Sequence, residues 1–281
     1  MHYKLERRLS HADVDFLGEL KVPAFLGLLE QAAVEASTAA GFDAAWYTRE
    51  SRTWIIHRTR LERFVPVGGT DTVAVDTEII DFRRARSLRR YEICRDAIRV
   101  ATATTDWVYC ELANGRPMRI PEAMQRVFMS GAAGVALPRA RPLPGEGPGV
   151  PVELTVTVRP SHLDHVVHVN NAVYASFLED GAFALFATRG WPLPRMLAAS
   201  GALRIRWLDF EYLSDAQVGT QLTVRSWLRD EQAFAADSEQ APRAVELLQT
   251  ITRAEGATVM RAATHWVWRH PAPIVGAAPS A

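Results

Sequence analysis

The chain contains 281 residues, of which 48% are hydrophobic and 23% are charged, a balance typical of globular rather than disordered proteins. Its 32 basic and 32 acidic side chains cancel, which argues against a surface built for nucleic acid or for an anionic membrane. Two cysteines are too few for a disulfide framework or a conventional zinc site. The sequence shows no secretory signal and no run of the roughly 18 apolar residues that a membrane span needs. We therefore expect a cytoplasmic protein.

The first part of the chain predicts one long helix between a short strand and four further strands. A strand is expected over 2–9, and apolar residues at i, i+3 and i+4 spacing then predict a helix over 22–41. Pro23 suits the first turn of this helix, and Gly41 suits its end. Alternating and β-branched stretches predict the strands that follow. These strands cover 53–65, 71–82, 87–96 and 98–110.

The second part of the chain repeats this order. A shift of 149 residues places Asp15 on Asp164, and a shift of 159 near the end of each copy places Trp107 on Trp266. The second copy therefore predicts one helix and five strands as well. The helix covers 172–189, and the strands cover 151–159, 201–212, 220–229, 243–254 and 257–268. One long helix packed on an antiparallel sheet of about five strands, present twice, is an α+β arrangement.

Segments rich in Gly and Pro divide the chain. We predict an N-terminal domain over 1–130, a linker over 131–150, a C-terminal domain over 151–270 and a mobile tail over 271–281.

The stretch SHLDHVVHVNNAVY, residues 161–174, concentrates polar side chains directly before the second helix. Asn170 and Asn171 stand where a helix cap is expected. The unpaired amides of a first helical turn form a positive pole that polarises a carbonyl oxygen. Asp164 reaches the same space if the loop folds back, and His168 can orient a ligand or hydrogen-bond Asp164. Together these groups are a sufficient set for acyl-transfer hydrolysis.

Two other interpretations of this stretch stay open. The polar residues can cap the helix without any catalytic role, which is common in proteins. His162, His165 and His168 lie three residues apart and can suggest a metal site, although no fourth ligand lies nearby.

The segment RPSHLDHVVHVNNAVYASFLEDG (159–181) resembles the signature of hotdog-fold thioesterases, in which an Asp precedes His-Val-Asn-Asn, a helical Tyr and a Glu. Further segments extend the resemblance to acyl-ACP thioesterases over nearly the full length. They are WIIHRTRLERFVPVGGTDTVAVDTEI (54–79), TDWVYCELANGRPMRIP (105–121) and FEYLSDAQVGTQLTV (210–224). These enzymes are two fused hotdog domains and are related to 4-hydroxybenzoyl-CoA thioesterase-like proteins. The resemblance implies the same tandem fold here.

The resemblance also implies roles for single residues. Asp164 matches the catalytic carboxylate and His168 the motif histidine, while the Asn pair starts the helix. Asp215 matches an acidic residue that precedes a cysteine in the plant enzymes, and Ala216 replaces that cysteine. Val166 stands where the plant pattern has an Asn that orients substrate or water.

The first copy departs from the motif. It keeps Asp15 but has Glu19 in place of the motif histidine, and LKVP replaces VNNA. The resemblance therefore implies one site, in the second copy, with the first copy helping to form the acyl pocket. Glu179 is either a further active-site carboxylate or part of a solvated helix face, and Glu30 is its equivalent in the first helix.

The function implied is hydrolysis of acyl-ACP or acyl-CoA thioesters to free carboxylic acids, in fatty-acid or polyketide biosynthesis, without a metal or redox cofactor. Substrate contacts are expected from Tyr174, Trp54, Phe177 and Leu178, between helix and sheet. Arg86, within RRARSLRR (83–90), would belong to a basic rim for an acidic carrier protein, unless these arginines only face solvent. The alternatives are a hotdog enoyl or 3-hydroxyacyl-thioester hydratase-dehydratase and a catalytically weak acyl-thioester-binding module. A monomer or a homodimer of tandem pairs is expected.

Overall fold

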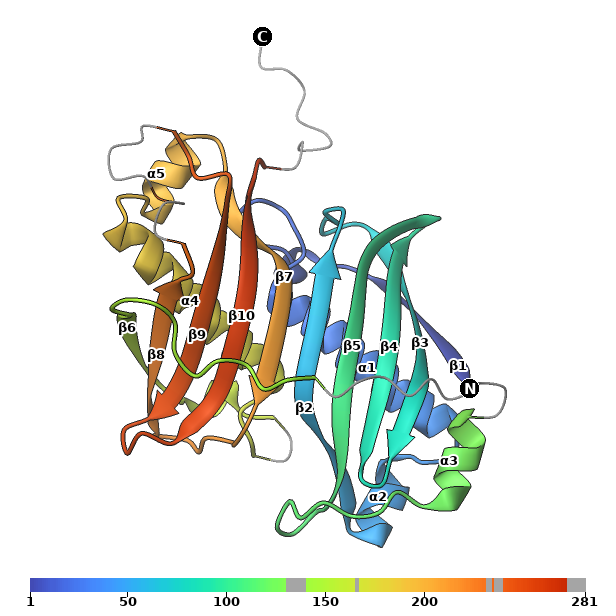
Figure 1. Cartoon of the computed structure of the whole chain (residues 1–281). Helices are drawn as coiled ribbons and strands as arrows, with labels where there is room; N and C mark the ends of the chain where they lie inside the picture. The colour runs from blue at the N-terminus through green and yellow to red at the C-terminus, as the bar shows by residue number, and fades with distance from the viewer. Residues whose placement is uncertain (130–139, 165–166, 231–233, 235–239, 272–281) are drawn as a thin grey trace.

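The computed structural model describes residues 1–129, 140–164, 167–230, 234 and 240–271. Its strands form one ten-stranded antiparallel sheet in the order β1-β3-β4-β5-β2-β7-β10-β9-β8-β6. The first five strands in this order come from the N-terminal half of the chain and the last five from the C-terminal half (Figure 1). The expected α+β fold of two fused hotdog units, each a long helix on five strands, is confirmed.

The elements of the N-terminal half follow the predicted order, with two short helices added. They are β1 (His2–Arg8), α1 (Val22–Ala39), α2 (Ala44–Glu50), β2 (Arg52–Arg63), β3 (Thr72–Arg83), β4 (Arg86–Arg95), β5 (Ile98–Glu111) and α3 (Glu122–Met129).

The C-terminal half repeats the same order, with one short helix added. It contains β6 (Val152–Thr157), α4 (Asn171–Thr188), α5 (Leu193–Ala198), β7 (Ala202–Tyr212), β8 (Gln221–Leu228), β9 (Ala244–Arg253) and β10 (Thr258–Arg269). The ends of every predicted helix and strand lie within two residues of the observed ends.

The two halves join along β2 and β7, which pair antiparallel. Leu61 lies opposite Leu208 at this seam, and both side chains are buried. Each strand also carries a bulge at the same place: one extra residue, His57 in β2 and Arg206 in β7, interrupts the pairing with the last strand of its own half. Equivalent bulges at the shift of 149 residues confirm that the halves are two copies of one structure.

Helices α1 and α4 lie side by side on one face of the sheet, and the chain between the halves crosses the opposite face (Figure 1). That chain is held to the sheet: the Arg58 guanidinium donates to the Arg141 carbonyl at 2.7 Å, and the Leu143 amide donates to Glu211 Oε2 at 3.1 Å. The described part of the predicted linker, from residue 140, is therefore fixed against the strands of both halves rather than extended into solvent.

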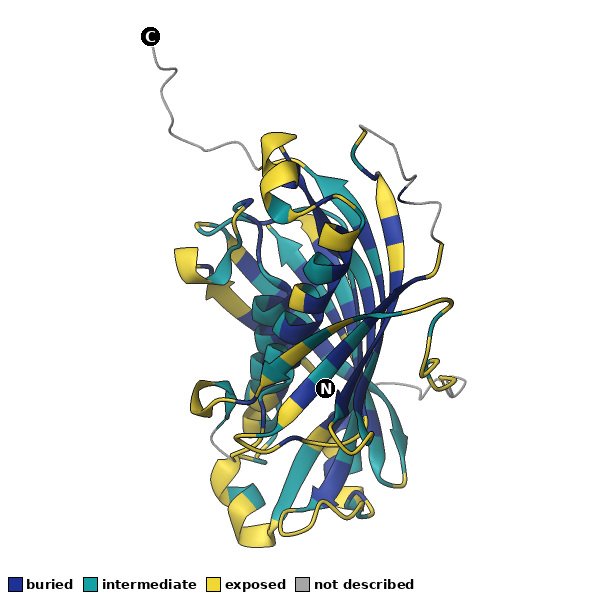
Figure 2. Ribbon diagram, turned by 90° about the vertical axis from the view of Figure 1, so that its left-hand side faces the viewer, coloured by how far each residue is buried: buried dark blue, intermediate teal, exposed yellow. Residues whose placement is uncertain are grey.

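Figure 2 shows that buried residues lie on the facing sides of the long helices and the sheet. The apolar residues among them form the main core cluster. α4 approaches the sheet closely at Gly181, where an added Cβ would lie 2.6 Å from Val224 Cγ1. The equivalent residue of α1 is Ala32, which is fully buried. No helix in the described ranges is both long enough and apolar enough to cross a membrane.

Candidate active site

The motif loop between β6 and α4 is closed by its own hydrogen bonds. Leu163 and Val169 form an isolated antiparallel bridge. The Asp164 amide donates to the His168 carbonyl at 2.8 Å, and the His168 amide donates to Asp164 Oδ1 at 3.1 Å. The loop therefore folds back, as the sequence analysis required, and holds the Asp164 carboxylate beside the start of α4.

The start of α4 is capped as predicted. Asn170 is the N-cap residue, and its side chain accepts from the Ala172 amide at 2.8 Å. The Val173 amide donates to the Asn170 carbonyl at 2.9 Å. In the part of the chain that the structure describes, the Asn171 amide has no such partner. This amide is therefore the donor of the first turn that remains for a substrate carbonyl.

Asp215 reaches the motif loop from the connection between β7 and β8. His168 Nε2 lies 3.8 Å from Asp215 Oδ2, and a guanidinium nitrogen of Arg253 lies 3.7 Å from Asp215 Oδ1. The His168 and Asp215 side chains are 55% and 51% exposed. Polar contacts this exposed contribute little to stability, so they orient these groups rather than holding the fold.

Tyr174 lies beneath this cluster. Its side chain is buried, and its ring contacts those of Phe177 and Tyr212 edge-on, with centroids 6.2 Å apart in both pairs. Burial raises the pKa of the Tyr174 hydroxyl, and the negative charge of Asp215 raises it further. Tyr174 therefore stays protonated at neutral pH. Tyr212, from the end of β7, donates to the Asn171 carbonyl at 3.4 Å.

Glu179 lies about two turns further along α4, away from the motif loop. Its carboxylate is 3.2 Å from Arg204 Nη2, and the same nitrogen is 2.7 Å from Asp15 Oδ2 of the first copy. Burial raises the pKa of Glu179, although Arg204 and Arg63 oppose this shift. Glu179 thus belongs to a buried ion cluster at the equivalent loop of the first copy, and not to a solvated helix face.

The first copy builds the same loop from different side chains. Asp15 Oδ1 accepts from the amides of Leu17 and Glu19, at 2.8 and 3.1 Å, just as Asp164 accepts from the His168 amide. Glu19 accepts from Arg63 Nη2 at 3.1 Å, and both side chains are buried. The loop geometry is therefore common to both copies, whereas the surroundings differ.

The residues expected to line an acyl pocket are spread over two apolar clusters. Trp54 packs on Tyr109 and donates to the Tyr47 hydroxyl at 2.9 Å, in a cluster with α2 and α3. Phe177 and Leu178 belong to the main core, where Phe177 contacts the His162 ring at 5.1 Å. The structure brings Phe177 against His162 of the motif loop, places Leu178 in the core beside it on α4, and places Trp54 in the other cluster.

The arginines of residues 83–90 are largely paired within the sheet. Arg86 pairs with Asp106, Arg83 with Asp81 at 2.7 Å, and Arg90 with Glu78. Arg89 is buried, and one of its guanidinium nitrogens donates to the Thr77 hydroxyl at 3.3 Å. Acidic neighbours therefore neutralise most of the predicted basic rim, Arg86 included.

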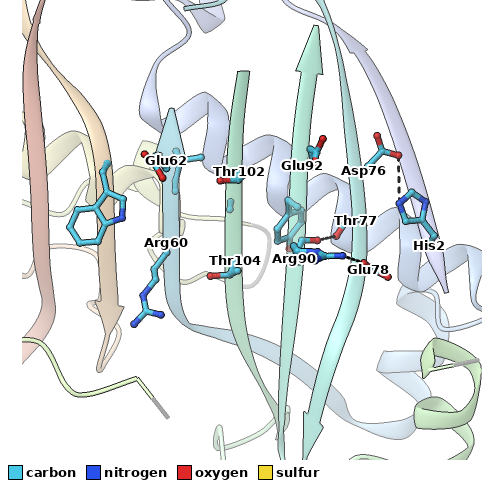
Figure 3. A pocket seen from close by; sticks show the side chains of 14 residues that line it. His2, Arg60, Glu62, Asp76, Thr77, Glu78, Arg90, Glu92, Thr102 and Thr104 are labelled. Carbon is cyan, nitrogen blue, oxygen red and sulfur yellow. Dashed lines mark hydrogen bonds and ion pairs between the residues drawn. The ribbon is translucent and has the colours of Figure 1, made fainter. Parts of the chain in front are cut away.

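A hollow of about 630 Å³ lies on the face of the sheet away from the helices (Figure 3). Side chains of both signs line it, among them Arg60, Glu62, Arg90 and Glu92. The motif loop and the helix ends lie on the other side of the sheet. This hollow is therefore distinct from the acyl pocket expected between helix and sheet.

His165 and Val166 lie outside the described residues. Of the three histidines weighed as metal ligands, His162 accepts from the Arg159 amide at 3.0 Å, and His168 faces Asp215. These two rings therefore have different partners. Among the described residues, no group of three or more His, Cys, Asp or Glu side chains is placed to hold a metal ion.

Arg204, Arg63 and Tyr212 were not among the predicted site residues. Arg204 and Arg63 have partners in the other half, so no local pattern marks them. The repeat could have marked two of these residues, because Arg63 and Tyr212 occupy equivalent positions at the shift of 149 residues and differ in charge.

Two copies of one helix on one continuous antiparallel sheet, each with a polar loop ahead of its helix, define a tandem hotdog protein. Residues 1–128 match the family model of the acyl-ACP thioesterase N-terminal domain. The expected resemblance to acyl-ACP thioesterases is thus confirmed over these residues. No curated protein sequence gives a significant match.

Solved structures match the fold over nearly the whole chain. A putative oleoyl thioesterase from Lactobacillus plantarum has a TM-score of 0.78 at 17% identity and covers 95% of this chain and 96% of its own. An acyl-ACP thioesterase from Bacteroides thetaiotaomicron has a TM-score of 0.72 at 18% identity, and a 12:0-ACP thioesterase from Umbellularia californica has 0.71 at 15%. Each of these two covers 95% of this chain and 98% of its own. At these identities the solved structures show the fold. The match to the acyl-ACP thioesterase domain model supports the expected class of enzyme, a thioester hydrolase.

Proposed function

We propose that the chain hydrolyses acyl thioesters of an acyl carrier protein, or of coenzyme A, at the start of α4. The main support for this proposal is that a carboxylate, a helix amide and a histidine lie together at the motif loop. The Asp164 carboxylate is held by its loop, the Asn171 amide begins the helix, and His168 faces Asp215.

The substrate carbonyl oxygen would accept from the Asn171 amide, which lies at the positive end of the α4 dipole. Water then attacks the carbonyl carbon, and one of its protons passes to Asp164. The carbonyl electron pair moves to the oxygen at the helix end, where the negative charge is stabilised. When the carbonyl re-forms, the carbon–sulfur bond breaks, and Asp164 returns the proton to the sulfur. The products are a carboxylic acid and a thiol, so the step balances without a cofactor.

His168 and Asp215 would orient the substrate beside this water. Their exposed position suits contact with the pantetheine arm that both carriers share. Ala216 stands where the plant enzymes have a cysteine, and Cys110 is buried with its pKa raised by burial. These features favour water over a thiolate as the nucleophile.

Acyl-ACP is the favoured carrier because the family model that matches residues 1–128 is that of acyl-ACP thioesterases. Phe177 and Leu178 remain proposed acyl contacts, whereas Arg86, already paired with Asp106, is a weaker candidate for carrier docking. A cytoplasmic location, a monomer or dimer of tandem pairs, and the domain limits 1–130 and 151–270 stay predictions.

The test is thiol release from a panel of acyl-ACP and acyl-CoA substrates of graded chain length. Wild type should hydrolyse acyl-ACP with a higher kcat/KM than acyl-CoA, and Asp164→Ala should lose on the order of 100-fold or more in kcat. Asp96→Asn is the matched control: Asp96 lies in the β4–β5 turn at φ 55, a conformation that Asn tolerates, and activity should not change.

Unchanged turnover in Asp164→Ala would remove the catalytic assignment. Hydration of an enoyl thioester without thiol release would favour a hydratase. Tight binding of acyl thioesters without turnover would favour a binding module.

A further inference from the structure

The two copies differ in which side chains surround the loop aspartate. At the shift of 149 residues, each position around Asp15 has an equivalent around Asp164. The equivalence holds in three dimensions, because the loops close with the same bridge, the helices begin and end at equivalent residues, and both strands bulge at the same place.

In the first copy, two arginines fill the space between the loop and the helix of the other half. Arg204, from β7, bridges Asp15 and Glu179 at 2.7 and 3.2 Å. Arg63, from β2, pairs with Glu19. Arg204 is only 3% exposed, so its guanidinium is buried together with the carboxylates that it pairs with.

Neither arginine has a counterpart in the second copy. Ile55 stands at the position of Arg204, and Tyr212 stands at the position of Arg63. Ile55 is 40% exposed although it is a large apolar residue on a sheet strand. The position that holds a buried guanidinium in the first copy therefore holds an uncharged, partly exposed side chain in the second copy.

The same equivalence locates Glu30. Glu179 of α4 faces the aspartate of the N-terminal loop, so Glu30 of α1 faces the aspartate of the C-terminal loop. A second observation agrees with this placement. Burial raises the pKa of Tyr212, and the negative charge of Glu30 raises it further. The Tyr212 hydroxyl donates to the Asn171 carbonyl at the start of α4. Glu30 thus lies within electrostatic reach of the helix end at which we place the reaction.

We propose that Glu30 completes the active site across the domain interface, as a second carboxylate that accepts a hydrogen bond from the attacking water. The inference rests on the proposed hydrolysis. Asp164 takes one proton of the water, and Glu30 holds the other, which remains on the product acid. The site is then composite, with Asp164, His168 and Asn171 from one half and Glu30 from the other.

The first experiment measures kcat, KM and the melting temperature of Glu30→Gln on the best substrate of the panel. Gln keeps the size of the side chain and removes its charge. We expect kcat to fall on the order of 100-fold, with KM and melting temperature little changed, and Glu30→Asp to recover part of the loss. The control is Glu35→Gln, which lies on the same helix and accepts from the Tyr3 hydroxyl.

The second experiment places an arginine at position 55, the equivalent in the second copy of Arg204 in the first. Ile55→Arg should abolish turnover without lowering stability, because the new guanidinium would lie between Glu30 and Asp164 as Arg204 lies between Glu179 and Asp15. Ile98→Arg is the matched control: this isoleucine is 49% exposed on β5, and activity should be unchanged.

Three outcomes separate the claims. Loss of turnover in Glu30→Gln with an unchanged melting temperature supports the inference. Wild-type kcat in Glu30→Gln and in Ile55→Arg, from a chain in which Asp164→Ala is inactive, overturns the inference and leaves the proposed function intact. Absence of thioester hydrolysis by the wild type overturns both.

Discussion

The two helix-loop units of this chain share a backbone and differ in charge. The loop of the first copy holds Asp15 and Glu19 beside two buried arginines. The loop of the second copy holds Asp164 and His168, and Ile55 and Tyr212 stand at the positions of the two arginines. The first arrangement buries its charges: Glu19 pairs with Arg63 of its own half, and Asp15 pairs with Arg204 of the other half. The second leaves His168 and its partner Asp215 about half exposed. The same fold element therefore serves assembly in one half and, on our proposal, chemistry in the other.

The largest effect on stability is expected from removing Arg204 from the buried ion cluster of the first copy. Arg204→Met leaves Asp15 and Glu179 buried without their shared cation, which should cost about 3–5 kcal/mol of unfolding free energy. Ile55→Met, at the equivalent position of the second copy, should change stability by less than about 0.5 kcal/mol. Urea unfolding of both variants measures the difference. Equal losses would show that the two positions do not differ as described.

A smaller effect is expected where the helices meet the sheet. Gly181→Ala places a Cβ 2.6 Å from Val224 Cγ1 and 3.1 Å from Ser226 Oγ, so overpacking should cost about 1–3 kcal/mol. Ala normally stabilises a helix relative to Gly by about 0.5–1 kcal/mol. A rise in the melting temperature of Gly181→Ala would thus contradict the close approach of α4, a position that α1 fills with Ala32.

The N-cap residues of α4 and α1 should differ by about 1 kcal/mol in their contribution to the free energy of unfolding. Asn170→Ala removes the side-chain bond to the Ala172 amide and should lower the unfolding free energy by about that amount. The equivalent N-cap of α1, Lys21, makes no side-chain cap bond. Lys21→Ala should therefore be nearly neutral in the same thermal unfolding assay, and equal losses in the two variants would argue against a distinct cap on α4.

The smallest effect concerns the bulges, where His57 is equivalent to Arg206. Burial lowers the pKa of His57 below its ordinary value of 6.5, and Arg86 lowers it further, while Asp106 and Glu211 oppose the shift. The folded protein thus binds this proton more weakly than the unfolded chain does. The stability from neutral His57 is complete above pH 6.5 and is lost as pH falls through the lowered pKa.

His57→Asn should therefore lose less stability than wild type between pH 7 and pH 5, measured as melting temperature against pH. Parallel curves for the two proteins would contradict the lowered pKa. Substitution of Arg206 by Gln should not change the slope, because arginine stays charged throughout this range.

The long elements followed from the sequence because each extends far enough to show its period. Alternation over β3 and the apolar spacing over α1 placed their ends within two residues. The short helices α2, α3 and α5 were missed. Helices of six to eight residues show too few turns for a pattern and depend on packing for their stability. α3, for example, is stabilised by Met124 and Phe128, which are buried in the second apolar cluster.

The site was partly predictable. Asp164, Asn170 and Asp215 came from a motif and a resemblance. The structure places Asp164 and Asn170 on one loop and brings Asp215 to within 3.8 Å of His168 on that loop. Glu179 could not be placed, because its partners Arg204 and Asp15 come from distant parts of the chain.

The basic rim was overestimated for a related reason. Glu78 lies directly opposite Arg90 on the neighbouring strand. The composition of residues 83–90 alone does not reveal such cross-strand partners.

The most direct test compares the two loop aspartates in one assay of acyl-thioester hydrolysis. Asp164→Asn and Asp15→Asn remove the same charge from equivalent loops. The account predicts that Asp164→Asn loses on the order of 100-fold or more in kcat and keeps its stability. It predicts that Asp15→Asn keeps the kcat of each folded molecule and loses stability, because Arg204 loses a partner. Retained turnover in Asp164→Asn, together with lost turnover in folded Asp15→Asn, would contradict it.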